Sequence, residues 1–196
     1  TRLIRDLGGA TDATSTVMFA CSLVGIACTG GVGALTGTVI TRFNVPPFIA
    51  TLSTMLVASG TAFILADGQS IHQVPERFVT LGRASGPFGI PYAVWLVVVL
   101  YGAGHLLMRR RRMGRYLYAV GGNSEAARLA GVPVRRVTLF AYVACGLLSG
   151  LGGVVMASQL KSGSPTYGTM YELYVIAAVV VGGTSLRGGE GSIVGT

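Results

Sequence analysis

The sequence predicts an all-α fold, a polytopic membrane helix bundle with about four full spans plus a shorter re-entrant or broken helix. Hydrophobic residues make up 51% of its 196 residues and charged residues only 11%, whereas a soluble domain carries about 25% charged residues. So little charge cannot cover a globular protein of this size with water-binding groups. Long uncharged runs, and an arginine-rich segment between two of them, complete the prediction.

Four uncharged runs are each long enough to cross a bilayer. Residues 13–41, 43–66, 84–108 and 137–160 contain no Asp, Glu, Lys or Arg and are 29, 24, 25 and 24 residues long. A helix needs about 20 apolar residues to cross a hydrocarbon core about 30 Å thick. A buried helix of a soluble protein would explain one such run, but not four. We therefore expect spans at residues 16–40, 48–66, 92–108 and 137–160.

A fifth uncharged run is shorter and predicts a different element. Residues 173–186 form a run of 14 residues, too short for a full span and typical of a re-entrant or broken helix. The chain opens with a loop that lacks the charged start and cleavage site of a signal peptide, and it stops after a glycine-rich turn. We therefore expect residues 1–196 to be a single transmembrane domain and an internal fragment of a longer protein.

The positive charge of the chain is concentrated in residues 109–136. This segment holds eight arginines and one acid, Glu125, and so carries +7 of the net charge of +8. A nucleic-acid site is the other usual meaning of an arginine cluster, but a cluster between two spans favours a cytoplasmic loop by the positive-inside rule. Alternation then places the turn at Arg42 in the cytoplasm. The loops at 67–91 and 161–172 are external, and the short run dips back from that side.

The external loop at 67–91 carries charges of both signs. The spans contain pairs of small residues at a four-residue spacing. Glycines spaced four apart allow two helices to approach closely in lipid, where helices gain no hydrophobic drive from meeting. The cysteines are expected to be packing residues, because no His or acid joins them to make a metal site. The loop charges are His72, Glu76, Arg77 and Arg83, the glycine pairs are Gly33/Gly37 and Gly146/Gly150, and the cysteines are Cys21, Cys28 and Cys145.

The second span has a marked start and many hydroxyl groups. Pro46 or Pro47 fits the first turn of a helix, where a missing N–H costs nothing. Hydroxyls on a span either bond back to their own helix or line a pathway, and both interpretations stay open here. The hydroxyl residues are Thr51, Ser53, Thr54, Ser59 and Thr61.

Glycines near the end of the chain do not form a nucleotide-binding loop. The pairs Gly182-Gly183 and Gly188-Gly189, followed by Gly191, match neither the Walker pattern nor the dinucleotide fingerprint, and no strand precedes them. We therefore expect no ATP site and no cofactor in this chain.

The segment at 121–134 predicts a short helix between two spans. Asn123 or Ser124 is a suitable N-cap, Glu125 suits the positive helix end, and Gly131 followed by Pro133 stops the helix. A helix of about two turns is unstable in water unaided. It is therefore either a docking helix for a cytoplasmic partner or an ordered loop held by the bundle, and the residues alone do not decide between these.

At these residues the sequence resembles the permease subunits of ribose- and xylose-type ABC importers. Residues 121–134 resemble their cytoplasmic coupling segment, and the likeness covers about residues 33–196. One position departs from the family, because Tyr174 stands where an acidic residue is usual, so no ion pair is carried over there. The other similar motifs are Val-Pro-Pro-Phe-Ile-Ala-Thr-Leu from Val45, Cys-Gly-Leu-Leu-Ser-Gly-Leu-Gly-Gly from Cys145, Gly-Ser-Pro-Thr from Gly163, and Glu172 to Thr196 with Ile-Ala-Ala-Val-Val-Val-Gly-Gly-Thr-Ser-Leu from Ile176.

The resemblance implies a multi-pass permease of the inner (plasma) membrane that moves a monosaccharide by alternating access. The permease has no catalytic residues of its own. Its implied partners are a cytoplasmic ATP-binding subunit that hydrolyses ATP, a second permease copy, a periplasmic or extracellular sugar-binding protein and the lipid bilayer. The implied coupling residues are Asn123, Ser124, Glu125, Ala126, Ala127, Arg128 and Gly131, and the gate or pathway candidates are Thr51, Gly182, Gly183, Thr184 and Ser185.

Two alternatives remain beside the sugar importer. One is a permease of a related amino-acid or nucleoside ABC importer. The other is an ion-coupled secondary transporter or channel, which would need an acid or a histidine inside a span. The ionisable candidates are His105, Asp67 and Glu172, and all three lie close to the ends of apolar runs, which counts against ion coupling.

Overall fold

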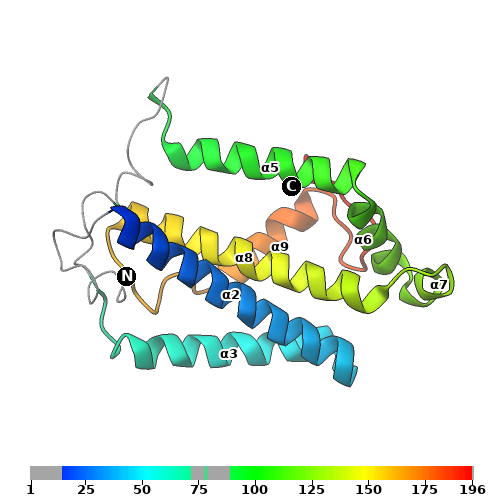
Figure 1. Cartoon of the computed structure of the whole chain (residues 1–196), viewed down its shortest axis with the longest axis horizontal. Coiled ribbons are helices and arrows are strands. Elements are labelled where there is room, and N and C mark those ends of the chain that lie inside the picture. The colour runs from blue at the N-terminus through cyan, green and yellow to red at the C-terminus, as the bar shows by residue number, and fades with distance from the viewer. Residues whose placement is uncertain (1–14, 72–77, 79–88, 196) are drawn as a thin grey trace. The chain divides into compact units, whose positions relative to one another are not determined.

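The computed structural model of the chain describes residues 15–71, 78 and 89–195, and the described part is helical (Figure 1). Two ranges of the sequence analysis, the first fourteen residues and most of the charged loop with His72, Glu76, Arg77 and Arg83, lie outside the described residues. The helices are α2 (Ser15–Phe43), α3 (Pro47–Leu65), α5 (Tyr92–Arg110), α6 (Arg112–Gly122), α7 (Ser124–Leu129), α8 (Val134–Leu160) and α9 (Tyr171–Val181).

Four of these helices, α2, α3, α5 and α8, are long and apolar enough to cross a membrane. Each of their ends lies within three residues of the predicted span. In each helix only 6–11% of the most apolar 18-residue window is buried within the chain. Apolar helices with so little buried surface are stable when lipid is the solvent. The predicted membrane helix bundle is confirmed.

The arginine-rich segment contains more helix than the sequence analysis predicts. Residues 112–122 form α6, where only a loop was expected, and α8 begins at Val134 and so includes Arg135 and Arg136. Half-buried side chains recur in α6 at the three- and four-residue spacing of a helix face, which explains why the segment is helical despite its charge. These are Met113, Tyr116, Leu117 and Val120.

The structure divides into two compact units, each of which is described by itself. The first comprises residues up to Trp95 together with Tyr142–Tyr167, and therefore contains α2, α3 and most of α8. Helix α3 begins as predicted, with Pro46 as N-cap and Pro47 at the first helical position. At the other end of α3, Ile71 forms an isolated antiparallel bridge with Gly163, with N–O distances of 2.8 and 2.9 Å.

The start of α2 and the end of α8 share a small core. Phe78 is 3% exposed and packs with Met18, and Cys21 of α2 and Ala157 of α8 pack against this pair. The hydroxyl of Ser158, which is fully buried, donates a 2.6 Å hydrogen bond to the carbonyl oxygen of Phe78. Together with the bridge after α3, these contacts place the start of α2 and the ends of α3 and α8 at one end of the unit. This agrees with the alternation that the charges predict, and Cys21 is a packing residue.

Glycines bring α2 and α8 into contact (Figure 1). A Cβ atom added to Gly146 would lie 2.5 Å from the carbonyl oxygen of Thr29 and 3.3 Å from the Cα of Gly30. A Cβ on Gly33 would collide with the carbonyl oxygen of Tyr142, and one on Gly150 with the hydroxyl of Thr29. The predicted small-residue contact is confirmed for Gly33, Gly146 and Gly150, and Thr29 and Gly30 are partners that the spacing did not indicate.

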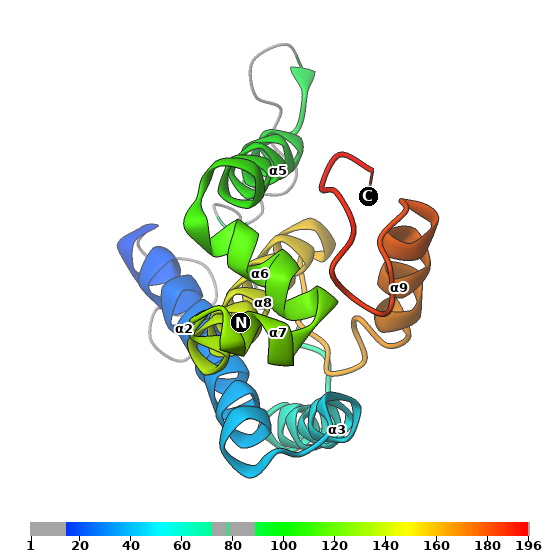
Figure 2. The ribbon, with the colours of Figure 1, turned by 90° about the vertical axis from the view of Figure 1, so that its right-hand side faces the viewer.

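The second unit comprises Leu96–Ala141 and the chain from Gly168 onward, and so contains most of α5, all of α6, α7 and α9, and the first turns of α8. Helix α9 is 11 residues long, which confirms a short apolar helix in place of a full span. It ends at Val181, five residues earlier than the apolar run. The loop that follows runs beside α6 (Figure 2).

Candidate functional site

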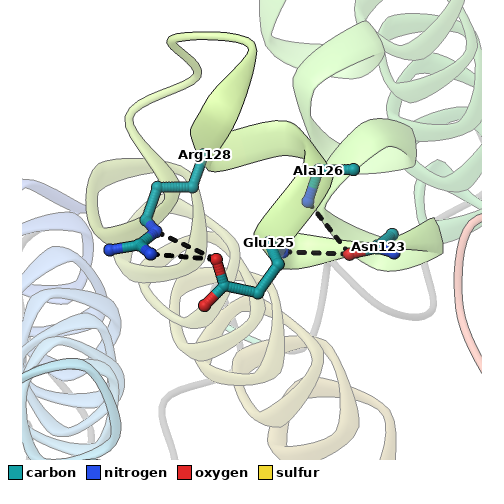
Figure 3. A network of polar contacts seen from close by, with 4 residues as sticks. All are labelled: Asn123, Glu125, Ala126 and Arg128. Carbon is teal, nitrogen blue, oxygen red and sulfur yellow. Dashed lines mark hydrogen bonds and ion pairs between the residues drawn. The ribbon is translucent and has the colours of Figure 1, made fainter.

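Helix α7 is short, and both of its ends are capped. The side-chain oxygen of Asn123 accepts hydrogen bonds from the backbone N–H groups of Glu125 and Ala126, both at 3.0 Å (Figure 3). At the other end Gly131 has φ +79°, and the N–H of Val132 donates to the carbonyl oxygen of Ala127 at 3.0 Å. This is a Schellman cap, for which glycine is preferred because the left-handed conformation costs it little. The predicted N-cap and stop signal are confirmed.

Two opposite charges lie on one face of α7. A guanidinium nitrogen of Arg128 is 3.0 Å from a carboxylate oxygen of Glu125, and its Nε donates to the same oxygen at 3.1 Å (Figure 3). The two side chains are 69% and 71% exposed. An ion pair this exposed contributes only about 0.5 kcal/mol to stability. The pair is therefore presented at the surface and does little to hold the helix.

The two faces of α7 are unlike. Ala127 is 5% exposed and lies on the face opposite the ion pair, whereas Leu129 is 85% exposed and lies beside it, four residues after Glu125. Ala127 thus packs the helix against the rest of the protein. Leu129 presents a large apolar side chain to solvent next to the two charges. Sequence reasoning missed Leu129, although its four-residue spacing from Glu125 was a signal that could have found it.

The base of α7 is continuous with α6. The N–H of Asn123 donates to the carbonyl oxygen of Ala119 at 3.1 Å, so the residue that caps α7 also closes α6, and the two helices contact each other. Of the residues implied to couple, Ser124, Ala126 and Gly131 are exposed with the charged pair, and Ala127 alone is buried.

The gate candidates after α9 form its end and the first part of the following loop. Gly182 caps α9, and Gly183 has φ +86°. The N–H of Thr184 donates to the carbonyl oxygen of Val179 at 3.1 Å, which completes a second Schellman cap. The N–H of Ser185 donates to the carbonyl oxygen of Glu190 at 3.1 Å. These residues therefore fix where α9 stops and how the chain turns back.

The hydroxyl groups of α3 bond mainly within their own helix. Thr51 donates to the carbonyl oxygen of Pro47 at 2.9 Å, and Thr61 donates to that of Ala58 at 2.8 Å. Thr54 donates to Ala50 at 2.8 Å and also accepts from Thr36 of α2, with 3.1 Å between the oxygens. Thr54 thus joins two spans, while Thr51 is exposed and stays a pathway candidate.

Ionisable groups are sparse at membrane depth. His105 lies half-buried in α5, Asp67 follows the end of α3 with φ +52°, and Glu172 is exposed in the first turn of α9. Within the described ranges no group of three or more His, Cys, Asp or Glu side chains lies close enough to hold a metal ion.

The four apolar helices define a multi-pass membrane protein, and the capped helix α7 gives it an exposed polar segment between two of those helices. The chain belongs to the family described as the permease component of the branched-chain amino acid transport system, whose model matches residues 7–196. It is therefore a membrane protein of this permease family.

Several curated permeases are similar to this chain. The ribose import permease protein RbsC of Escherichia coli K12 is 40% identical over 175 residues, which cover 87% of this chain and 54% of that protein. The L-arabinose transport system permease protein AraH of the same strain is 43% identical over 157 residues, 80% of this chain and 48% of that protein. RbsC of Bacillus subtilis is 43% identical over 161 residues, which cover 82% of this chain and 50% of that protein. The chain spans about half the length of these relatives, and no solved structure matches it.

Proposed function

We propose that this chain forms part of the transmembrane permease of an ATP-binding-cassette importer that moves a monosaccharide across the inner (plasma) membrane by alternating access. Relatives with about 40% identity carry the names of ribose and L-arabinose permeases, and both of these sugars are pentoses. The permease itself does no covalent chemistry in this proposal. A cytoplasmic subunit hydrolyses ATP, a second permease copy completes the pathway, and a periplasmic or extracellular binding protein delivers the sugar.

The observation that carries the proposal is the two-faced geometry of α7. The helix is seated by the buried Ala127 and presents Glu125, Arg128 and Leu129 together on its exposed face. It lies in the segment that the arginine count predicts to be cytoplasmic. An exposed leucine beside two exposed charges combines an apolar anchor with polar neighbours, the composition of a docking surface. This geometry favours docking over an ordered loop without a partner.

Charge reversal tests the docking face. We expect Glu125→Arg to abolish sugar uptake and to remove the stimulation of ATP hydrolysis by the loaded binding protein. A cation in the first turn of α7 costs about 1 kcal/mol of helix stability, which is too little to unfold the bundle. The measurement uses the assembled transporter in vesicles and follows labelled pentose uptake and phosphate release.

The exchanged pair provides the control. Glu125→Arg with Arg128→Glu restores an ion pair within α7 but presents the two charges in reverse order. If a partner protein contacts these two charges, sugar uptake stays low in the exchanged variant. Full recovery in the exchanged variant would show that the pair acts only within the helix. Normal uptake in Glu125→Arg itself, with assembly unchanged, would contradict docking through α7.

A truncation of the apolar anchor tests the same face without changing charge. We expect Leu129→Ala to weaken the assembly of the permease with the ATP-binding subunit, because a buried anchor leucine contributes about 1–3 kcal/mol to an interface. Co-purification of the two subunits at decreasing concentration measures this change. Unchanged co-purification would remove Leu129 from the docking surface.

The family description favours a second substrate class, since it names branched-chain amino acids. Uptake of labelled substrates by the assembled transporter separates the two proposals. Uptake of labelled ribose or arabinose by the assembled transporter would support the sugar, whereas uptake of labelled leucine without pentose uptake would support the amino acid. Uptake that persists without ATP and stops with an ionophore would support ion coupling in place of both.

A further inference from the structure

The chain after α9 folds back on itself to form a compact loop, residues 182–195, called the glycine loop here. Its two arms lie against each other. The N–H of Ser185 donates to the carbonyl oxygen of Glu190, and a Cβ on Gly191 would lie 2.7 Å from the hydroxyl oxygen of Thr184. The N–H of Gly188 donates to the carbonyl oxygen of Ser185 at 3.0 Å. The tip of the loop is therefore the pair Gly188–Gly189, and its base is the cap of α9.

The tip of the glycine loop contacts the last turn of α6 (Figure 2). A Cβ atom on Gly121 would lie 2.6 Å from the backbone nitrogen of Gly189 and 3.3 Å from its Cα. In the other direction, a Cβ on Gly188 would lie 2.7 Å from the carbonyl oxygen of Gly121. The hydroxyl of Tyr118, one turn earlier in α6, donates a 2.8 Å hydrogen bond to the carbonyl oxygen of Gly191.

Only glycine allows this approach from the loop side. Gly188 and Gly189 have φ values of +84° and +80°, a region that glycine occupies readily and other residues avoid. Backbone then lies directly on backbone, with no flexible side chain between the two segments. A close-packed contact of this kind has little free volume, so a displacement of one segment moves the other or breaks the contact.

The contact lies between the two functional segments of the second unit. Gly121 is two residues before Asn123, which caps α7. The opposite arm of the glycine loop begins at Gly182, which caps α9. The route from α7 to α9 therefore runs through the last turn of α6 and through one short loop.

We propose that the contact of Gly121 and Tyr118 with the tip and returning arm of the glycine loop transmits the movement of α7 to α9. This inference rests on the proposed function, because it takes α7 as the helix that docks on the ATP-binding subunit. In it, Gly121, Gly188 and Gly189 are positioning residues. They bind neither ATP nor sugar, and they set where α9 ends when α7 moves.

Two neighbouring glycines of α6 provide a matched test. Gly121 and Gly122 are consecutive, but a Cβ on Gly122 would lie 3.9 Å from the Cα of Gly189, an ordinary contact distance. Both substitutions replace a glycine by alanine in the last turn of α6, where alanine is the better helix former. We expect Gly121→Ala to assemble with the ATP-binding subunit. We expect its sugar uptake per ATP hydrolysed to fall about tenfold, which lies within the range of typical coupling factors between two sites. We expect Gly122→Ala to stay within about twofold of the unchanged protein.

The hydrogen bond provides a milder variant that leaves the backbone contact in place. We expect Tyr118→Phe to lower uptake per ATP by about threefold to fivefold, because it removes one hydrogen bond of about 1 kcal/mol. This variant decides the matter if Gly121→Ala does not fold. Size-exclusion chromatography in detergent and co-purification with the ATP-binding subunit show which variants are assembled.

The outcomes separate this inference from the proposed function. The inference is supported if Gly121→Ala assembles normally but takes up less sugar per ATP hydrolysed, while Gly122→Ala takes up a normal amount. Equal behaviour of the two alanine variants, or normal coupling in both Gly121→Ala and Tyr118→Phe, would overturn it. In either case the charge reversal at Glu125 still tests docking, since its readout does not depend on the glycine loop. Failure of the proposed function would instead show as absent sugar uptake in the unchanged transporter.

Discussion

Glycines make close contacts in both units of this chain, but the two contacts differ in kind. In the first unit, Gly146 and Gly150 lie in the middle of α8 and face α2 through regular helical backbone. In the second unit, Gly188 and Gly189 lie in a loop and have positive φ values. A helix glycine is needed only for space, whereas a loop glycine is needed for space and for backbone conformation. The first contact joins residues 26–33 of α2 to residues 142–150 of α8. The second joins the last turns of α6 to one short loop.

This difference indicates that the α2–α8 contact stabilises the fold, whereas the glycine-loop contact can transmit movement from one segment to another. Two spans packed through several glycines lose many contacts at once if they separate. The glycine loop and the end of α6 share fewer contacts, so their separation costs less than that of the two spans. We therefore expect changes in the α2–α8 contact to affect stability, and changes in the glycine loop to affect coupling between segments more than stability.

The largest expected effect is a bulky substitution in the α2–α8 contact. Gly146→Leu should lower stability in detergent by at least about 2 kcal/mol, because overpacking of a tight contact costs that much or more. Gly152→Leu in the same helix is the matched control, since a Cβ there meets nothing within 4 Å. Thermal unfolding followed by size-exclusion chromatography measures both. Equal loss in the two variants would contradict the packing role of Gly146.

Truncation of leucines in α8 to alanine tests the same α2–α8 contact. Leu147 packs over Gly30 of α2, where a Cβ on Gly30 would lie 2.6 Å from the Leu147 Cδ2 atom, whereas Leu148 is 53% exposed. Gly150→Leu should therefore destabilise the bundle more than Leu148→Ala does, with Leu147→Ala between them. A ranking in which Leu148→Ala is the most harmful of the three would contradict the contact as described.

A substitution at the loop tip should act on the second unit alone. Gly188→Ala places a non-glycine residue at φ +84° and a Cβ 2.7 Å from the carbonyl oxygen of Gly121, and the backbone term alone costs about 1–2 kcal/mol. We expect faster amide hydrogen exchange in residues 112–130 and 182–195, with α2 and the end of α8 unchanged. Faster exchange throughout α2 would show that the two contacts are not independent.

Loss of the α7 cap should have a smaller and more local effect. Asn123→Ala removes the side-chain oxygen that accepts from two backbone N–H groups and should cost about 1 kcal/mol of helix stability. Hydrogen exchange in residues 124–130 should rise about fivefold. Asn123→Asp keeps the accepting oxygen and is expected to leave exchange unchanged, so an equal rise in both variants would exclude the cap as the cause.

The smallest expected effect is that of the exposed ion pair on stability. Glu125→Gln should change the unfolding temperature little, since pairs this exposed contribute about 0.5 kcal/mol or less. Its effect on coupling should be clearly larger than its effect on stability. A marked fall in the unfolding temperature would show that the pair holds α7 and does not serve docking.

The sequence predicted the long elements of this fold and that glycines pack between spans, but it did not show which distant segments pair. The predicted spans end within three residues of all four long helices, because lipid enforces length and lack of charge with little influence from tertiary packing. Helix α6 was missed because its arginines favour a loop in a hydropathy argument, although the half-buried Met113, Tyr116, Leu117 and Val120 follow a helical period.

The candidate site was predicted in part for similar reasons. Capping residues act within four positions of each other, so Asn123 and Gly131 were readable from local sequence. The contact of Gly121 with Gly189 joins residues far apart in the chain, and no local pattern specifies such a pairing. The exposure of Leu129 likewise depends on how α7 is seated, which the burial of Ala127 decides.

We expect α7 to lie on the cytoplasmic side of the membrane and the loop that follows α3 to lie on the external side. Two exposed serines, Ser124 in α7 and Ser70 after α3, allow a matched pair of cysteine substitutions. In a background without other cysteines, a membrane-impermeant thiol reagent added to intact cells should label Ser70→Cys and not Ser124→Cys, and inverted vesicles should show the reverse. Labelling of Ser124→Cys from outside intact cells would contradict the topology and, with it, the assignment of α7 as a docking helix for a cytoplasmic partner.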